Sequence, residues 1–482
     1  MTNLKILSIF ILDLHKEEVF LIKSKNKITI LNILSTLILQ GLAFFTGPVF
    51  SSLLGTSNFG ISSVYLTWVQ LASTVFSLQA ASTVAIARSN FPMDEQEKYQ
   101  SSTLSLSTLA YLAFSVITLV AAVVSSIWYR VDFAMLAVGL LHGWGMYCIT
   151  VMNSKFTYEF CADKNFILTL LTSVLSIALS IILIIVLPDE INYWGRILGQ
   201  AIIYFAIGLF LYCYMLNKGR MFYSKQYWTF TLPIAIPTIF HILANILLSQ
   251  SDKVMIQWLR DDASTGVYAL ACTFAAVLSS VWNALNNSWV PFYYEYTRRN
   301  EISELKRHSK NYIEMYTIVS MGFILLSREV FHIYAHDDFW VGTDLIPVFA
   351  LGFYFVFLYS FPVNYEFYHK STKMIASGTI LAAVCNIILN FAFIKLWGIE
   401  GAVIATATAH FLQFCFHFVC AKMIKNDEFP YKFKTFIPGT LMVFLSILIY
   451  WFTRDLWLIR WGLGAILGLY LLIKIFKRKE IF

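Results

Sequence analysis

Two charged residues interrupt an apolar run near the middle of the chain. Asp252 and Lys253 lie in the mostly apolar stretch of residues 232–268. A charge in such a stretch is expensive, and in a membrane-spanning segment it is by default a candidate functional site. Because neighbours on a helix point in different directions, the two charges do not neutralise each other. The pair is therefore predicted to be the charged end of a polar surface and not a catalytic dyad.

Three further polar residues precede Asp252 on the same helical face. From His241 to Asn245, Ser249 and Asp252 the steps are four, four and three residues. This spacing places all four side chains on one face of a helix. A helix that is polar on one face and apolar elsewhere is expected to line a water-accessible interior of a membrane protein.

Polar stripes also follow other predicted helices. A single hydroxyl residue in a membrane span often serves only close packing, but several in register favour a shared polar interior. His142 is a lone histidine between glycines, so it is more often a packing residue than a proton relay, and both interpretations stay open. In chain order the stripes are Ser63, Thr67, Gln70, Thr74 and Ser77 continuing toward Arg88, then Ser279, Asn283 and Asn286, then Asn386 and Asn390, then Thr406, His410, Gln413 and His417.

The composition identifies a polytopic membrane protein. The 482 residues are 58% hydrophobic and 13% charged, whereas about 25% of the residues of soluble proteins are charged. The apolar runs are about 20 residues long, which fits membrane-spanning helices and is too long for the strands of a membrane barrel. We expect an all-α protein with fourteen membrane-spanning helices.

The predicted helices divide into two similar halves and an accessory pair. Gly266-Val267-Tyr268 aligns with Gly60-Ile61-Ser62 at an offset of 206 residues, and Trp397-Gly398 aligns with Trp194-Gly195 at an offset of 203. Two similar offsets predict two six-helix lobes related by an axis along the membrane normal, around a central cavity. The predicted boundaries are 1–27 for an N-terminal cytoplasmic or interfacial segment, 28–217 for the first lobe, 218–424 for the second lobe, and 425–482 for two accessory helices and a cytoplasmic tail.

The distribution of basic residues predicts the orientation. With the N-terminus in the cytoplasm, the inner segments hold 27 of the 35 lysines and arginines. By the positive-inside rule, both ends of the chain are then cytoplasmic. Arg196, at the outer start of the sixth predicted span, is expected to extend to the outer interface. The net charge of +7 reflects loops beside anionic lipid, and no nucleic-acid partner is predicted.

Several kinds of chemistry have no counterpart in the sequence. There is no GxxxxGK[ST] motif to bind a nucleotide. The longest predicted outer segment contains His332, His336, Asp337 and Asp338, but no further ligand cluster completes a metal site, so a solvated turn is expected. No outer loop is long enough to carry catalytic residues. We therefore predict no enzyme, no cofactor and no resident metal.

Four blocks of sequence carry a resemblance to a known family. They are LLGTSNFGISSVYL at 53–66, SDKVMIQWL at 251–259 with TGVYALA at 265–271, NNSWVPFYYEY at 286–296 and LWGIEGAVIATATAH at 396–410. In order and spacing they resemble the polysaccharide-exporting branch of the multidrug/oligosaccharidyl-lipid/polysaccharide (MOP) exporter superfamily. The chain is most similar to the O-antigen or capsule repeat-unit flippases of that branch.

The resemblance implies a flippase that moves an undecaprenyl-diphosphate-linked oligosaccharide across a bacterial cytoplasmic (inner) membrane by alternating access, coupled to H⁺ or Na⁺. Besides this substrate and the membrane lipids, a polymerase and a chain-length regulator of the same pathway are candidate partners. The candidates for binding the head group are Arg88, Lys253, Arg298, Gln70, Asn245, Asn283 and His410. The candidates for ion coupling or relay are Asp252, His241, His417 and His142.

Two other functions stay open. The drug-extruding (MATE) branch of the same superfamily would favour cavity carboxylates for cation antiport, but the intramembrane acids are nearly confined to Asp252, with Glu366 near an inner end. A polysaccharide polymerase or ligase would need a large outer loop, and this chain has none. Both are therefore placed behind the flippase hypothesis.

Overall fold

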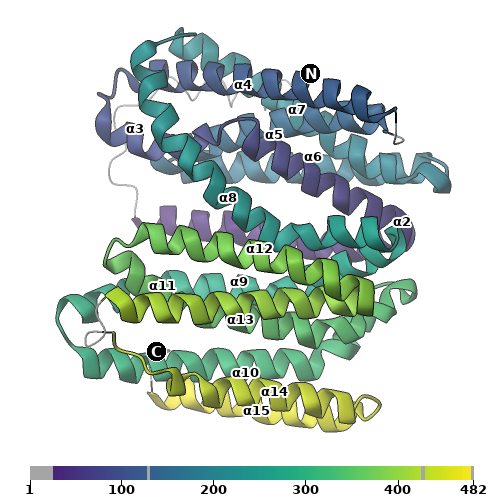
Figure 1. Ribbon diagram of the computed structural model, residues 1–482, viewed down its shortest axis with the longest axis vertical. Helices are drawn as coiled ribbons and strands as arrows, with labels where there is room; N and C mark the ends of the chain where they lie inside the picture. Colours follow the sequence, from purple (N-terminus) through teal and green to yellow (C-terminus); the bar gives the residue numbers. More distant parts are fainter. Residues whose placement is uncertain (1–24, 128–130, 425–428, 479–482) are drawn as a thin grey trace.

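The computed structural model describes residues 25–127, 131–424 and 429–478, and all regular secondary structure in these ranges is helical (Figure 1). Within them, eleven helices are long and apolar enough to cross a membrane, a bent pair of helices makes a twelfth span, and Ile437–Phe452 is a shorter apolar helix. The expected all-α polytopic fold is confirmed. The predicted interfacial segment lies mostly outside the described residues.

The first lobe consists of helices α2 to α7. Helix α2 contains the first predicted span and most of the second, and it is broken at Gly55, whose φ of 65° favours glycine. The second span then bends by 50° and continues into α3. The bounds are Lys25–Val75 for α2, Val84–Asn90 for α3, Gln96–Ser125 for α4, Phe133–Tyr158 for α5, Ala162–Val186 for α6 and Tyr193–Gly219 for α7.

The second lobe consists of helices α8 to α13. Helices α11 and α12 both pack against α13, and α8 packs against α12. A 3₁₀ segment, Asp337–Leu345, connects α10 to α11. The bounds are Lys225–Leu259 for α8, Asp262–Arg298 for α9, Ile302–Tyr334 for α10, Ile346–Tyr368 for α11, Thr372–Trp397 for α12 and Ile399–Ile424 for α13.

The two lobes touch backbone to backbone at their predicted outer end. A Cβ on Gly60 would lie 2.0 Å from the carbonyl oxygen of Asp262, and a Cβ on Gly266 would lie 1.9 Å from that of Thr56. Thr56 and Asp262 are separated by the same 206 residues as the two glycines. The contact is therefore symmetric in the way that the repeat predicts, and it needs glycine on both sides because any side chain would collide with backbone.

An apolar cluster surrounds this contact and closes the predicted outer end. It joins Phe50 and Phe59 of α2 to residues of α9, α10 and α11. The ring of Phe59 meets that of Phe339 edge to face at 5.7 Å, and the Tyr334 hydroxyl donates to the carbonyl oxygen of Phe44 at 2.9 Å. Apolar burial at this end holds the lobes together.

Helix α8 crosses from the first lobe to the second (Figure 1). Near its N-terminal end, the Trp228 indole donates to the carbonyl oxygen of Ser102 on α4 at 3.0 Å, and Thr231 shares a hydrogen bond with Tyr99 at 2.9 Å. Pro233 lies just beyond these contacts, and the rest of the helix continues to its packing against α12. One helix therefore contacts both lobes.

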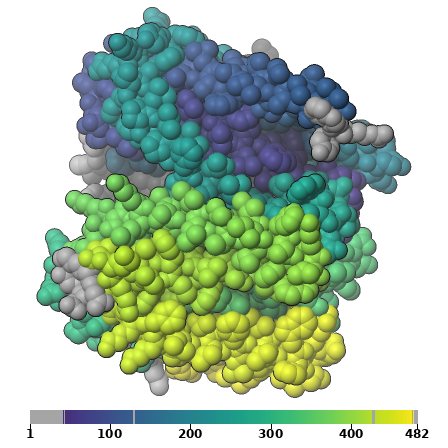
Figure 2. All heavy atoms as spheres, viewed as in Figure 1, coloured from purple at the N-terminus to yellow at the C-terminus, as the bar shows by residue number. Residues whose placement is uncertain are grey.

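The accessory helices α14 (Ile437–Phe452) and α15 (Trp457–Arg478) pack against α10. Figure 2 shows these C-terminal residues, in yellow, along the edge of the molecule farthest from the first lobe. The buried guanidinium of Arg460 pairs with Glu329 of α10, and Lys474 pairs with Glu314 at 2.6 Å. Ion pairs thus attach α15 to α10 near both of its ends.

Candidate functional site

Asp252 is the centre of a buried polar network in the second lobe. Its side chain is 2% exposed. One carboxylate oxygen accepts a hydrogen bond from Asn390 Nδ2 at 2.5 Å, and the other accepts from Thr406 Oγ1 at 2.6 Å and from the Tyr268 hydroxyl. A buried carboxylate is costly unless it is hydrogen-bonded, so these donors from α12, α13 and α9 stabilise its charged form.

Two asparagines one turn apart extend this network. Asn386 donates to Thr406 Oγ1 at 3.0 Å, and its own Oδ1 accepts from Asn390 at 3.0 Å and from Ser251 at 3.2 Å. The Oδ1 atom of Asn390 is buried and has no hydrogen-bond partner in the described ranges. A carboxylate beside an unpartnered amide oxygen offers hard oxygen atoms, which suit a proton or a small cation.

Lys253 follows Asp252 in sequence but does not join this network. Its ammonium group donates to Gln250 Oε1 at 2.7 Å. No carboxylate in the described part of the chain lies within ion-pair distance of the Lys253 charge. The side chain therefore carries a partly buried positive charge that is not neutralised by a direct ion pair.

Arg196, from α7 of the first lobe, lies near Lys253. Its guanidinium is held between the rings of Phe50 and Phe59, 4.8 Å from each centroid, and donates to Ser62 Oγ at 3.1 Å. Its buried Nε has no hydrogen-bond partner among the residues described, and its charge is close enough to repel that of Lys253. The expectation that Arg196 extends to the outer interface is therefore wrong: two aromatic rings hold it inside.

The polar face of α8 is exposed only over part of its length. Asn245 and Ser249 are exposed and His241 is half-buried, with Asn245 Nδ2 3.3 Å from His241 Nε2. Asp252 projects from the same face but is buried where α8 packs against α12. The expected continuous surface therefore ends before Asp252, because helical spacing fixes a side chain's direction and not what packs there.

Arg298 does not approach Asp252. It is exposed at the end of α9 and pairs with Glu295, one turn away on its own helix, at 2.8 Å. Thirty residues separate Arg298 from Tyr268 on α9, which is about 45 Å at 1.5 Å per residue. The other head-group candidates Gln70, Arg88 and Asn283 are half-buried on α2, α3 and α9.

His142 is buried inside the first lobe. Its Nδ1 lies 3.1 Å from the Tyr65 hydroxyl, and its ring packs against that of Tyr204 at 4.9 Å between centroids. No acid contacts it in the described ranges. These contacts favour the packing interpretation over the relay.

The stripe on α13 connects the Asp252 network to a second buried carboxylate. Thr406 donates to Asp252, and His410 Nδ1 lies 3.4 Å from Gln413 Oε1. His417 Nδ1 lies 2.9 Å from Glu366 on α11, and both side chains are fully buried. His417 is eleven residues after Thr406, which is about 16 Å along the helix. Polar groups therefore follow this helix over a length of about half a bilayer's hydrocarbon core, which is about 30 Å thick.

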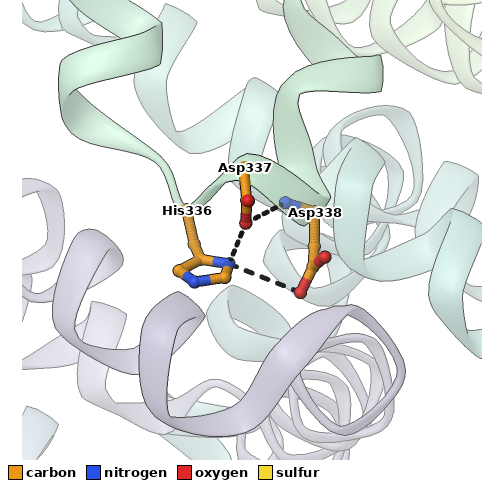
Figure 3. Close-up of side chains that lie close together, drawn as sticks. All are labelled: His336, Asp337 and Asp338. Atoms are coloured by element: carbon orange, nitrogen blue, oxygen red, sulfur yellow. Dashed lines mark hydrogen bonds and ion pairs between the residues drawn. The ribbon is translucent and has the colours of Figure 1, made fainter.

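The acidic turn at the predicted outer end brings three ligand-type side chains together (Figure 3). His336 Nδ1 lies 2.7 Å from Asp337 and 3.4 Å from Asp338, and all three residues are exposed. His332 does not belong to the group, because its Nε2 faces Thr343 Oγ1 at 3.2 Å. Exposed acidic groups of this kind are common without an ion, and the turn carries no metal assignment.

Sequence reasoning found the polar stripes but not which of them meet. Asn386, Asn390 and Thr406 were expected to face a common interior, not to contact Asp252 directly, and Tyr268 had no expected role. A signal was present: two asparagines one turn apart in an apolar run need polar partners, and an isolated carboxylate needs donors.

Comparisons with known proteins identify similar sequences. A family model described as "Polysaccharide biosynthesis protein" matches residues 26–297. An "Uncharacterized membrane protein" of Haemophilus influenzae is 26% identical over 172 residues, which is 35% of this chain and 42% of the relative. "Lsg locus putative protein 1" of the same organism is 23% identical over 180 residues, or 36% of this chain and 45% of the relative. The match thus spans less than half the length of these curated relatives.

Solved structures share the fold over most of the chain. The lipid II flippase MurJ in an inward closed conformation has a TM-score of 0.69 at 16% identity, covering 94% of this chain and 99% of that one. An inward-facing multidrug resistance MATE family transporter of the MOP superfamily has a TM-score of 0.56 at 13% identity, covering 83% and 98%. At these identities the likeness establishes the fold alone.

Proposed function

The chain belongs to the polysaccharide biosynthesis protein family, and from this premise we propose that it is a flippase that moves undecaprenyl-diphosphate-linked oligosaccharide repeat units, of O-antigen or capsule type, across a bacterial cytoplasmic membrane. Its fold is that of the MOP superfamily, as the resemblance implied. Both termini are proposed to be cytoplasmic. A polymerase and a chain-length regulator of the same pathway are proposed partners.

The observation that carries the proposal is a pair of cations from opposite lobes that no carboxylate neutralises by a direct ion pair. Arg196 of the first lobe and Lys253 of the second are close enough for their positive charges to interact unfavourably. A diphosphate would relieve this repulsion, and arginine and lysine are both established phosphate-binding side chains. A head group that crosses between two lobes needs contacts from both, which this pair supplies.

Asp252 is proposed to bind the coupling ion, H⁺ or Na⁺. It has three hydrogen-bond donors, and the unpartnered Oδ1 of Asn390 lies in the same network. A proton or cation bound there changes the charge of a buried cluster that connects α8, α9, α12 and α13. Lys253 is the next residue on α8. A shift of that helix on ion binding would therefore also move the Lys253 ammonium group, which is proposed to bind the substrate diphosphate.

Alternating access requires the closed end of the molecule to open. The contact of Gly60 with Gly266 and the apolar cluster around it join the lobes at the predicted outer end. In the proposed cycle the head group binds while this end is closed and leaves after the lobes separate there. The polyprenyl tail stays in the lipid throughout.

The test is surface-glycan display in a strain that lacks the chromosomal gene and carries plasmid-borne variants. The wild-type gene should restore display, whereas Lys253→Ala, Arg196→Gln and Asp252→Asn should each lower it at equal protein abundance. His336→Ala, in the exposed turn, is the matched control and should behave as wild type. Normal display with all three variants would refute these roles.

A cation-coupled multidrug exporter is the second candidate, and the buried carboxylate of Asp252 is the observation that favours it. Overexpression would then confer drug resistance, while deletion would leave glycan display normal. A polymerase is less well supported, since the described outer connections are short. If the protein were a polymerase, deleting its gene would leave unpolymerised repeat units on the outer side of the membrane. If it is a flippase, deletion would leave those units on the cytoplasmic side.

A further inference from the structure

A carboxylate and an imidazole form a second buried pair, remote from the Asp252 network. Glu366 of α11 and His417 of α13 each have a side chain that is fully buried, and His417 Nδ1 lies 3.1 and 2.9 Å from the two carboxylate oxygens. One proton is shared in this contact; when it is on Nδ1, the imidazole donates to the Glu366 carboxylate. No lysine or arginine pairs with Glu366 within the described ranges, so the imidazole is its only cationic partner there.

The other ring nitrogen of His417 is unpartnered. Its Nε2 is buried and has no hydrogen-bond partner among the residues that the structure describes. With a proton on Nε2, imidazolium and carboxylate together are neutral. Without that proton the pair carries one uncompensated negative charge in a buried site, which is unfavourable. A proton gained or lost at Nε2 would therefore change the net charge of the lobe interior.

Helix α12 seals this atom from its surroundings. A Cβ on Gly378 would lie 2.5 Å from His417 Nε2 and 2.6 Å from Cε1, so the α12 backbone lies directly against the ring. The other titratable groups near the pair are Tyr359 of α11, whose ring is 5.9 Å from that of His417, and Cys420 of α13, which interacts with Glu366. Among the residues that the structure describes, no titratable side chain of α12 forms a hydrogen bond or an ion pair with Glu366 or His417. Access to Nε2 from the side of α12 would need α12 and α13 to move apart.

We propose that Glu366 and His417 form a proton-binding site at the predicted inner end of the second lobe, distinct from the site at Asp252, which is loaded through Nε2 when α12 separates from α13. Both residues lie near the ends of helices that the basic loops place on the cytoplasmic side. The α13 stripe of Thr406, His410 and Gln413 lies between the two sites. Coupling of the bound proton to transport rests on the proposed function, whereas binding of the proton does not.

The experiment measures proton binding without any transported substrate. Full-length protein in proteoliposomes on a solid-supported membrane is exposed to pH jumps in sodium-free buffer, and the transient charge displacement is recorded. Asp252→Asn removes the first site and serves as the background. The displacement should persist in Asp252→Asn and fall to the level of protein-free liposomes when Glu366→Gln is added. Glu366→Gln retains an oxygen that accepts from Nδ1, so it removes the charge while preserving the hydrogen bond.

Two results would overturn the proposal: no displacement in Asp252→Asn, or an unchanged displacement after Glu366→Gln is added to it. Because the measurement needs no lipid-linked sugar, failure of the flippase function leaves its outcome unaffected. Equally, a positive displacement does not depend on which solute the protein carries. The two hypotheses therefore fail separately.

A measurement on the wild-type protein guards against variants that do not fold. Diethyl pyrocarbonate modifies unprotonated imidazole nitrogen, and mass spectrometry locates the modified histidines. Modification of His417 should be slower than that of exposed His336 and should rise with pH, because only an unprotonated imidazole nitrogen reacts. His417 modification that is absent, independent of pH, or as fast as that of His336 contradicts a gated proton site.

Discussion

Substituting Gly60 with alanine tests whether the lobes must part at the glycine contact. The new Cβ would lie 2.0 Å from the carbonyl oxygen of Asp262 and 2.9 Å from the nitrogen of Gly266, both backbone atoms. Ordinary contact begins at about 3.4 Å, so the helices must separate by about 1.4 Å. Overpacking of this kind costs about 1–3 kcal/mol. Because the cost applies only while the lobes touch, the closed state should lose about 5- to 150-fold in relative population.

The assay is labelling of a cysteine placed inside the closed end. Leu54 belongs to the apolar cluster and is 5% exposed, so Leu54→Cys should react slowly with a membrane-impermeant maleimide in cells. In the double variant Gly60→Ala/Leu54→Cys, the same cysteine should react about 5- to 150-fold faster, in proportion to the loss of the closed state. Protein without Leu54→Cys gives the background from the native cysteines. Gly322→Ala is the matched control, since a Cβ there meets nothing within 4 Å.

The symmetric substitution makes the test sharper. A Cβ on Gly266 would lie 1.9 Å from the carbonyl oxygen of Thr56, so Gly266→Ala should act as Gly60→Ala does. The double variant should fall short of the sum, because one separation of the helices relieves both collisions and neighbouring substitutions are not additive. Labelling equal to wild type in both single variants, with Gly322→Ala also unchanged, would refute the claim that this contact defines the closed state.

Three further predictions address the network, the accessory helices and the orientation. Tyr268→Phe keeps the ring but removes one hydrogen-bond donor to Asp252. Hydrogen bonds to charged groups contribute about 1.5–3 kcal/mol, so the unfolding temperature should fall. An unchanged unfolding temperature would mean that Asp252 is not charged in the folded protein. Glu329→Gln leaves the buried Arg460 charge uncompensated and should destabilise the protein by about 3 kcal/mol, as measured by thermal unfolding in detergent. Glu314→Gln, which removes the ion pair at the other end of α15, is the control and should destabilise the protein less. Reporter fusions within residues 297–310 should report a cytoplasmic location, and an outer location would contradict the positive-inside assignment.

The sequence predicts the scaffold because membrane folding imposes few options. Apolar run length, the distribution of basic residues and the repeat at 206 residues predict the helices, their direction and the pairing of lobes. The repeat even identifies Gly60 and Gly266 as equivalents, which the structure places against each other. The arrangement of side chains was harder to predict. The spacing on α8 places Asp252 and Asn245 on one face, yet packing against α12 buries Asp252 and leaves Asn245 exposed. Burial of each side chain depends on how segments distant in the sequence pack, which helical spacing does not predict.

The two adjacent charges on α8 have different surroundings, and under the proposed function this difference would couple ion binding to substrate binding. Successive residues on a helix point about 100° apart, so Asp252 projects among α9, α12 and α13 while Lys253 lies near Arg196 of the first lobe. An ion bound at Asp252 and an anion bound between Lys253 and Arg196 would therefore act on the same rigid helix. Coupling requires that each ligand favour one position of that helix over another. Because the N-terminal part of α8 is hydrogen-bonded to the first lobe through Trp228, a change in its position is transmitted to both lobes.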